Sequence, residues 1–265
     1  MARRAISYHL IAILCGAFAL PHVKAATPAW SGSVAIAVRD MHFTEHDLAG
    51  RRIVSEHGVI PGVTAEACHQ AEEFSACLAA EHFASTIGYE GRTQSGAPVN
   101  TRTHVAQSRL QLFALRRWTS TVDLAGGIEW QRSDRDIRGS GIALGLNERY
   151  AGLRMLAGLQ HHAEFMQARM VTRGLLVLAE PERINIGFPM QLYDSAEVRS
   201  KPAAGVRLGV AMAQQGGVSI GLEFDWMRVR RSADYPLRHA GNVVGTVAQP
   251  EHVQRLLTLA LRYAY

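Results

Sequence analysis

The sequence predicts an all-β fold: a transmembrane antiparallel up-and-down β-barrel of ten strands, with eight strands as the alternative count. Three observations predict it. Apolar and polar residues alternate with a period of two in one segment after another, short and long connections alternate between these segments, and the chain ends on such a segment. Apolar residues make up 48% of the chain at a mean hydropathy of −0.02, so they are spread along it rather than gathered in blocks.

The chain begins with the layout of a secretory signal peptide. Arg3 and Arg4 precede an apolar stretch shorter than the ~20 residues that a spanning helix needs, and small residues follow it. We expect residues 1–25 to be this signal peptide, cleaved near Ala25, and residues 26–265 to form one outer-membrane barrel domain. The signal peptide holds three basic residues and no acid, so cleavage lowers the net formal charge from +5 to +2 and gives no reason to expect nucleic acid as a partner.

Ten segments carry the alternation. We expect strands at residues 33–43, 62–69, 74–89, 105–118, 121–131, 150–160, 165–173, 204–213 and 218–228, and from 253 to the end. Four connections are a few residues long, whereas five are long, at residues 44–61, 90–104, 132–149, 174–203 and 229–252. Outer-membrane barrels have short periplasmic turns and long extracellular loops. The sequence therefore predicts export to the outer membrane of a Gram-negative cell, with both termini on the periplasmic side.

The two sides of each expected strand differ in chemistry. Leu110 and Leu112 share one side of their strand, for example, while polar residues occupy the other. A soluble sandwich buries the apolar side, whereas lipid requires it outside. We therefore assign the polar side to the lumen, which predicts these lumen-lining residues: Arg109, Arg117, Asp123, Glu129, Arg154, Arg169, Arg173, Arg207, Glu223, Asp225 and Arg262.

The last ten residues, LLTLALRYAY, alternate without a polar tail. We expect them to be the final strand, which pairs with the first strand to close the barrel. The segment resembles the C-terminal signal that the barrel-assembly machinery recognises. That machinery and outer-membrane lipid are the expected partners, and the signal residues are Leu257, Leu259, Leu261, Tyr263 and Tyr265.

Aromatic residues are expected in two interfacial belts, as in other membrane-spanning barrels. Trp118 would lie with Tyr263 and Tyr265 at the periplasmic rim, and Trp130 and Trp226 would lie near the outer rim.

Two loop phrases carry a resemblance to a known family. FTEHDLAGRRIVSEHGVIPG (residues 43–62) and YEGRTQSGAPVNTRT (residues 89–103) resemble the first and second outer loops of small proteobacterial outer-membrane β-barrels of the porin-like and opacity-like kinds, usually described only as uncharacterised outer-membrane proteins. The resemblance extends over most of the chain after the signal peptide. It implies a location and an architecture, and no activity.

Cys68 and Cys77 lie in a stretch that departs from strand composition, TAEACHQAEEFSACLAAEHF. Ala and Glu favour a helix, but residues nine apart on a helix lie on opposite faces. A hairpin that turns near residues 71–73 allows both cysteines to face inward and pair, in keeping with their even number in an exported chain. We expect this disulfide, with free thiols or a local helix as the alternatives.

Seven arginines against four acids in the expected lumen admit two interpretations. A ten-stranded barrel is close to the size that side chains fill, and forked Arg–carboxylate pairs leave few free donors. We therefore expect a plugged lumen and a structural or surface-interaction role, with a narrow anion-biased porin-like channel as the alternative. The fourth long connection mixes apolar and charged residues, and we expect it to fold over the mouth or to contact a surface ligand.

An outer-membrane barrel hydrolase is the second alternative. His42, His46, His104 and Ser140 have no spacing that singles out a catalytic site. The phrase HFTEH formally matches a zinc-protease motif, but that chemistry needs a helix, and here a strand leads into a loop. We therefore expect no enzyme activity, catalytic residue, metal or cofactor, and we expect His161 and His162 to be exposed in a turn.

Overall fold

The computed structural model describes residues 29–93, 96–141, 143–165, 168–189, 192–213 and 217–265. The expected signal peptide, residues 1–25, lies outside the described residues. No helix in the described part is long and apolar enough to cross a membrane. The strands in chain order are β1 (Ala29–His46), β2 (Arg52–Gln70), β3 (Phe74–Arg92), β4 (Pro98–Arg117), β5 (Val122–Ile137), β6 (Leu146–Phe165), β7 (Ala168–Ala179), β8 (Arg183–Gly187), β9 (Ala196–Arg199), β10 (Ala203–Ala213), β11 (Val218–Val229), β12 (Tyr235–His239), β13 (Asn242–Val247) and β14 (Glu251–Ala264).

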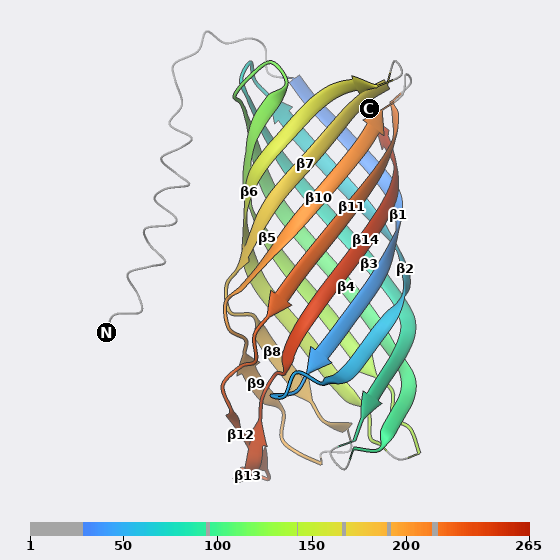
Figure 1. Ribbon diagram of the computed structural model, residues 1–265, viewed down its shortest axis with the longest axis vertical. Coiled ribbons are helices and arrows are strands. Elements are labelled where there is room, and N and C mark those ends of the chain that lie inside the picture. The colour runs from blue at the N-terminus through green and yellow to red at the C-terminus, as the bar shows by residue number, and fades with distance from the viewer. Residues whose placement is uncertain (1–28, 94–95, 142, 166–167, 190–191, 214–216) are drawn as a thin grey trace, which may run out of the picture.

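Ten of these strands close into an antiparallel barrel (Figure 1). Its order is β5-β4-β3-β2-β1-β14-β11-β10-β7-β6, and pairing of β5 with β6 joins the two ends. The first and last strands pair from Ser33–Ala264 to His46–Glu251. Closure gives every barrel strand two neighbouring strands, so the barrel itself has no edge strand. The predicted fold, with ten strands rather than eight, is confirmed.

The C-terminus is held in the barrel seam. The Tyr265 amide donates to the Gly32 carbonyl at 3.0 Å, and the Gly32 amide donates to the Tyr265 carbonyl at 3.2 Å. A Cβ at position 32 would lie 2.7 Å from Cζ of Tyr265, so glycine leaves the space that this ring occupies. The strand that opens the barrel and the strand that closes it therefore meet at one end, which we call the terminal end (upper in Figure 1). The opposite end is the loop end.

The barrel strands continue farther toward the loop end than the alternation predicted. The connections expected at residues 44–61, 90–104 and 132–149 shrink to segments 47–51, 93–97 and 138–145. Backbone pairing persists there, as between Asp134 and Arg149. In this region apolar side chains such as Val54 and Ile60 face inward and polar ones such as His57 face outward, so the alternation of the belt is not continued although the hydrogen bonding is. Most of the two phrases that resemble outer loops is therefore strand, and the prediction of loops there is wrong for most of their length.

Apolar side chains form a belt around the outside of the barrel. Ile36 and Leu112 are 67% and 53% exposed, and the other strands contribute similar residues: Val63, Leu78, Ile128, Leu159, Leu176, Leu208, Ile220 and Leu259. A face of this kind is the one that lipid covers in a membrane barrel. Trp118, Tyr263 and Tyr265 are exposed at the terminal-end rim of the belt, and Trp130 is exposed on its other side.

The fourth and fifth connections fold together at the loop end. β8 pairs with the edge of β6 and β9 pairs with β8, while β12 and β13 form a separate hairpin that projects beyond the barrel (Figure 1). Tyr150, Ile184 and Val198 form a small buried core against which Tyr235 and Val247 pack. β8 and β9 therefore continue the barrel wall beyond β7 at the loop end, along the edge of β6.

Candidate functional site

Eight charged side chains meet in the middle of the lumen, seven of them buried and Glu81 partly buried, and we call them the central network. Arg207 is its best-connected member: Nη1 donates to Glu129 at 2.7 Å and Nη2 donates to Asp225 at 2.8 Å. Arg109 Nη1 reaches the same Asp225 oxygen at 3.3 Å. The members are Arg39, Arg109, Arg154 and Arg207 with Glu81, Glu129, Glu182 and Asp225. Four guanidinium groups face four carboxylates, so the network is balanced in charge.

Three members of the central network were missed in the sequence. Arg39 donates to Glu81 at 2.7 Å from the inward face of β1. Arg39 lies on the side of the strand opposite to the outward-facing Ile36, and this alternation was the signal in the sequence that Arg39 faces the lumen. Glu81 lies in the hairpin whose composition resembled a helix. Glu182 reaches Arg154 at 3.7 Å from the segment between β7 and β8, which no strand pattern marks.

A second polar group, which we call the outer cluster, lies nearer the loop end. Arg135 sits among three carboxylates: Nε donates to Glu56 at 3.0 Å, and Nη1 contacts Glu148 and, at 3.4 Å, Glu45. The other members are Tyr150, Gln249 and His252. The outward residues at this level, such as His42, are polar, so the outer cluster lies beyond the apolar belt.

Burial and charge shift two pKa values in the outer cluster. Burial, together with the negative charges of Glu148 and Glu56, raises the pKa of Glu45 to about 7, against the opposing charge of Arg135. Burial lowers the pKa of His252 to about 3. Glu45 is held by the Gln249 amide, which donates to it at 3.0 Å. Neutral Glu45 and neutral His252 are therefore both favoured inside this cluster.

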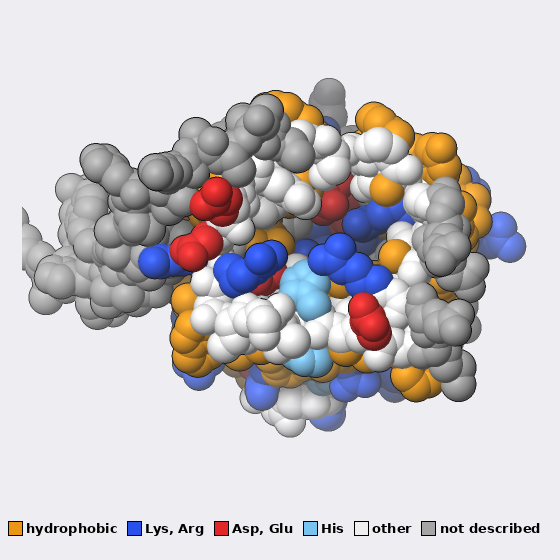
Figure 2. All heavy atoms as spheres, turned by 90° about the horizontal axis from the view of Figure 1, so that it is seen from above, with side chains coloured by type: hydrophobic (Ala, Val, Ile, Leu, Met, Phe, Trp, Pro, Cys, Tyr) orange, Lys and Arg blue, Asp and Glu red, His pale blue; other side chains and the backbone are white. Residues whose placement is uncertain are grey.

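The lumen is filled at its centre and hollow at the terminal end. A void of about 30 Å³, the size of one water, lies between the central network and the outer cluster beside Arg154 and His252. On the terminal side of the central network lies a cavity of about 180 Å³. A further cavity of about 420 Å³ forms the mouth at that end. Figure 2, seen from this end, shows arginine, histidine and acidic side chains gathered in a hollow within a partly hydrophobic rim.

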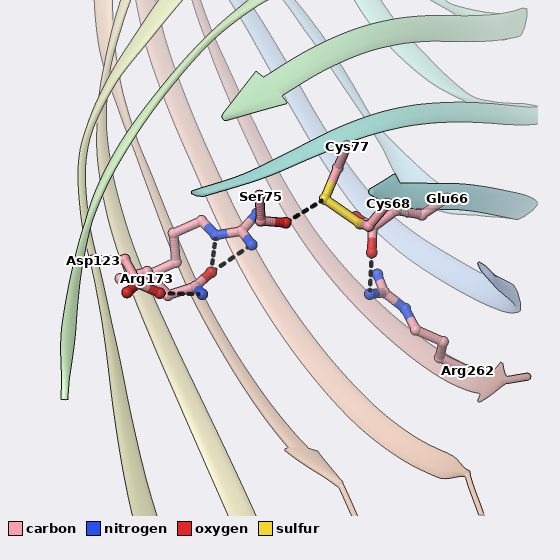
Figure 3. Close-up of a disulfide and its surroundings, with 8 residues drawn as sticks. Glu66, Cys68, Ser75, Cys77, Asp123, Arg173 and Arg262 are labelled. Carbon is pink, nitrogen blue, oxygen red and sulfur yellow. Dashed lines mark hydrogen bonds and ion pairs between the residues drawn. A yellow bond between two sulfur atoms is a disulfide. The ribbon is translucent and has the colours of Figure 1, made fainter. Parts of the chain in front are cut away.

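The disulfide Cys68–Cys77 lies at this mouth (Figure 3). The two cysteines are register partners on β2 and β3, with 4.1 Å between their Cα atoms, and both are buried. The hairpin, not the helix, is therefore the observed structure of this stretch. Arg262 contacts Glu66 nearby at 3.4 Å.

His161 and His162 correct one prediction. Both lie within β6 rather than in a turn, because the strand continues to Phe165. His162 Nε2 lies 2.6 Å from Asp123 Oδ2 on the lumen side. The expected exposed turn residue is therefore part of a polar chain in the mouth.

The expected lumen residues divide into two groups. Arg109, Asp123, Glu129, Arg154, Arg207 and Asp225 are buried, whereas Arg117, Arg169, Arg173, Glu223 and Arg262 are more exposed and line the terminal-end cavities. Four of the buried residues border these cavities as well: Arg109, Glu129 and Arg207 the smaller one, and Asp123 the mouth. The residues of the expected assembly signal, Leu257, Leu259, Leu261, Tyr263 and Tyr265, all lie on the exposed face of the closing seam.

The structure does not assemble the histidines into a hydrolase site. His42 points outward on β1, where its ring stacks on that of His57 at 6.1 Å between centroids, and Glu45 of the same motif points inward. His104 lies on the exposed face of β4, and Ser140 lies in the segment between β5 and β6. Among the described residues, no group of three or more His, Cys, Asp or Glu side chains is arranged to hold a metal ion.

Comparisons with known proteins define the class of fold. No family model matches the sequence, and no curated protein matches it. The solved structure of the outer membrane protease OmpT from Escherichia coli is similar, with a TM-score of 0.56 and 12% identity over 92% of this chain and 99% of that one. The chain therefore has the fold of outer-membrane β-barrel proteins.

Two further solved structures are more distant. The translocator domain of the autotransporter NalP from Neisseria meningitidis gives a TM-score of 0.49 at 12% identity over 98% of each chain. The attachment invasion locus protein Ail of Yersinia pestis gives 0.36 at 10% identity over 89% of this chain and 98% of that one.

Proposed function

We propose that the protein is an outer-membrane barrel with a structural or surface-interaction role, and that its lumen is closed by Arg–carboxylate pairs. The central network carries this proposal. Its core pair, Glu129 and Arg207, is 1% and 4% exposed, and Arg109 on β4 crosses the lumen to Asp225 on β11, on the opposite side of the barrel, at 3.3 Å. Paired charges packed across a narrow barrel support a closed lumen.

The full set of lumen charges argues against an anion-biased channel. Arg39 and Arg135 add two arginines to the seven expected ones. Six acids join the four expected ones: Glu45, Glu56, Glu66, Glu81, Glu148 and Glu182. Because neutral Glu45 is favoured, these nine arginines face nine charged acids within the part of the chain that the structure describes, which removes the excess of positive charge that an anion-biased channel requires.

The void beside the outer cluster argues against a hydrolase. Glu45 and His252 have shifted pKa values, which can mark a catalytic site. The space beside His252 is about 30 Å³, which admits a water and no substrate. These groups therefore fit a structural role better.

The loop end supports surface interaction. Val243 and Val244 are 58% and 54% exposed on the projecting β12–β13 hairpin. With the apolar belt in the outer membrane and the terminal end in the periplasm, this hairpin faces the cell exterior. Two adjacent exposed valines at such a tip are suited to contact with another molecule.

Planar-bilayer recording with the purified protein tests the closed lumen. We expect no unitary conductance steps, and reproducible steps would refute closure. Heat-modifiable migration of the outer-membrane fraction on gels tests the location, because folded barrels resist unfolding without boiling. A protein recovered only in the soluble periplasmic fraction would refute it.

A further inference from the structure

Arg173 differs from the arginines of the central network in the partner that holds it. Its Nε and Nη2 donate to the side-chain oxygen of Gln160 at 3.0 and 2.6 Å, and its guanidinium carbon lies 4.6 Å from the centre of the Phe113 ring. Both partners are neutral. No carboxylate among the described residues lies within ion-pair distance of Arg173, so its charge is not cancelled by a bound acid.

The neutral partner is itself held in place. The Gln160 amide nitrogen donates to Asp123 at 3.4 Å and lies 3.2 Å from Nε2 of His162, which is 2.6 Å from the same carboxylate. Because the amide nitrogen faces Asp123, the amide oxygen faces Arg173. The guanidinium is therefore fixed before any ligand arrives, which lowers the entropic cost of binding.

The charge of Arg173 faces open space. Arg173 and Arg262 both line the cavity of about 180 Å³ and the mouth of about 420 Å³. The smaller cavity holds about six waters at ~30 Å³ each, which is room for a tetrahedral oxyanion with part of its hydration shell. Gln160 engages Nε and Nη2 of the guanidinium, and among the described residues no hydrogen bond occupies Nη1, which can donate to a ligand.

We propose that this terminal-end cavity is a binding site for a small oxyanion of the phosphate or carboxylate class. The ligand oxygens accept from Arg173. Arg262, three strands away around the barrel and held by Glu66 at 3.4 Å, supplies a second positive charge. Arg109 and Arg207 also line the cavity, together with the carboxylates of Glu66, Glu81, Glu129 and Glu223, and these acids favour a small anion over a large polyanion. This proposal rests on the proposed closed lumen in one respect. Closure of the lumen makes the site accessible from the terminal end alone.

Calorimetric titration of the folded protein in detergent with inorganic phosphate tests the site. We expect saturable binding to one site, and Arg173→Gln should weaken it by about 10- to 100-fold, the worth of hydrogen bonds to a charged group. Gln160→Glu keeps the guanidinium but gives it a carboxylate partner, so it should weaken phosphate binding to a similar degree while the barrel stays folded. A parallel titration with succinate separates phosphate from carboxylate recognition.

Arg255→Gln is the matched control, because Arg255 is exposed on the outward face of β14 and does not line either cavity. It should bind phosphate as the wild type does. Absence of saturable binding of either anion to the wild type, or equal binding by wild type and both lumen variants, would overturn the proposal.

Bilayer recordings separate this proposal from that of the closed lumen. Conductance steps whose anion selectivity disappears in Arg173→Gln would support the site and refute closure. Silent bilayers together with absent anion binding would refute the site and leave closure standing.

Discussion

Glu129→Gln is the sharpest test of the central network. Glu129 accepts from Arg207 at 2.7 and 3.1 Å and lies 3.5 Å from Arg154, with all three side chains nearly inaccessible to water. The neutral amide leaves four guanidinium groups against three carboxylates. Removing one partner of a buried pair costs about 3–5 kcal/mol, because the remaining charge stays desolvated. We expect a loss of unfolding free energy of that size.

The measurement is urea unfolding in lipid vesicles, followed by tryptophan fluorescence and by the gel shift of the folded barrel. Glu223→Gln is the control, because this acid is half-exposed and 3.7 Å from Arg207; it should cost less than about 1 kcal/mol.

The double variant Glu129→Gln/Arg207→Met leaves three positive and three negative side chains in the central network. Its loss of unfolding free energy should therefore be clearly smaller than the sum of the losses in the two single variants. If Glu129→Gln is as stable as Glu223→Gln, or if the two single effects simply add, the network does not act as described.

Three further predictions follow from other parts of the barrel. Deletion of Tyr265 should lower the amount of folded protein in the outer membrane, because the seam loses its last backbone pair with Gly32, and Tyr265→Asp should do the same because it replaces the exposed terminal ring of the signal with a charge; unchanged levels by quantitative blotting would contradict this role. Gly32→Val should reduce assembly in the same assay, since its Cβ would meet the Tyr265 ring at 2.7 Å, whereas Ser33→Ala next to it should not. For the outer cluster, the pKa of Glu45 rises on folding from 4.5 to about 7, so this residue contributes stability that is present at low pH and is lost as the pH rises from 4.5 through 7. His252, whose pKa falls on folding from 6.5 to about 3, contributes with the opposite sign between pH 3 and 6.5. The two slopes, each about 1.4 kcal/mol per pH unit at most, should partly cancel in the wild type between pH 4.5 and 6.5, and Glu45→Gln should expose a clear loss of stability as the pH falls through that range; equal pH profiles for both proteins would rule this out.

Hydropathy predicted the membrane-facing half of the barrel well. Leu257, Leu259 and Leu261 share one side of a strand for a local reason, because successive side chains point to opposite faces and lipid covers only one of them. Each of the ten strands could be located in this way. The pattern failed beyond the apolar belt, where β1 to β6 continue without a continuous apolar outer face and buried apolar residues such as Val54 and Ile60 point into the barrel.

The lumen could be predicted only in part. Arg207 and Glu129 could be assigned to the interior by parity, but their direct contact joins β10 to β5 across the barrel. Their spacing of 78 residues carries no local signal of that contact. Glu182 was beyond prediction for a different reason, because it enters the lumen from a connecting segment and not from a strand.

The sequence by itself favoured ten strands over eight and determined the apolar outer face and the closing role of the last strand, because each depends on side-chain alternation along a single segment. Only the tertiary structure decided which charges neutralise one another, that Arg173 is held by neutral Gln160 and the Phe113 ring, and that the hollow lies at the terminal end. Those properties depend on which residues the barrel's curvature and register bring face to face across the lumen, and this is set by closure of the whole sheet rather than by any one strand.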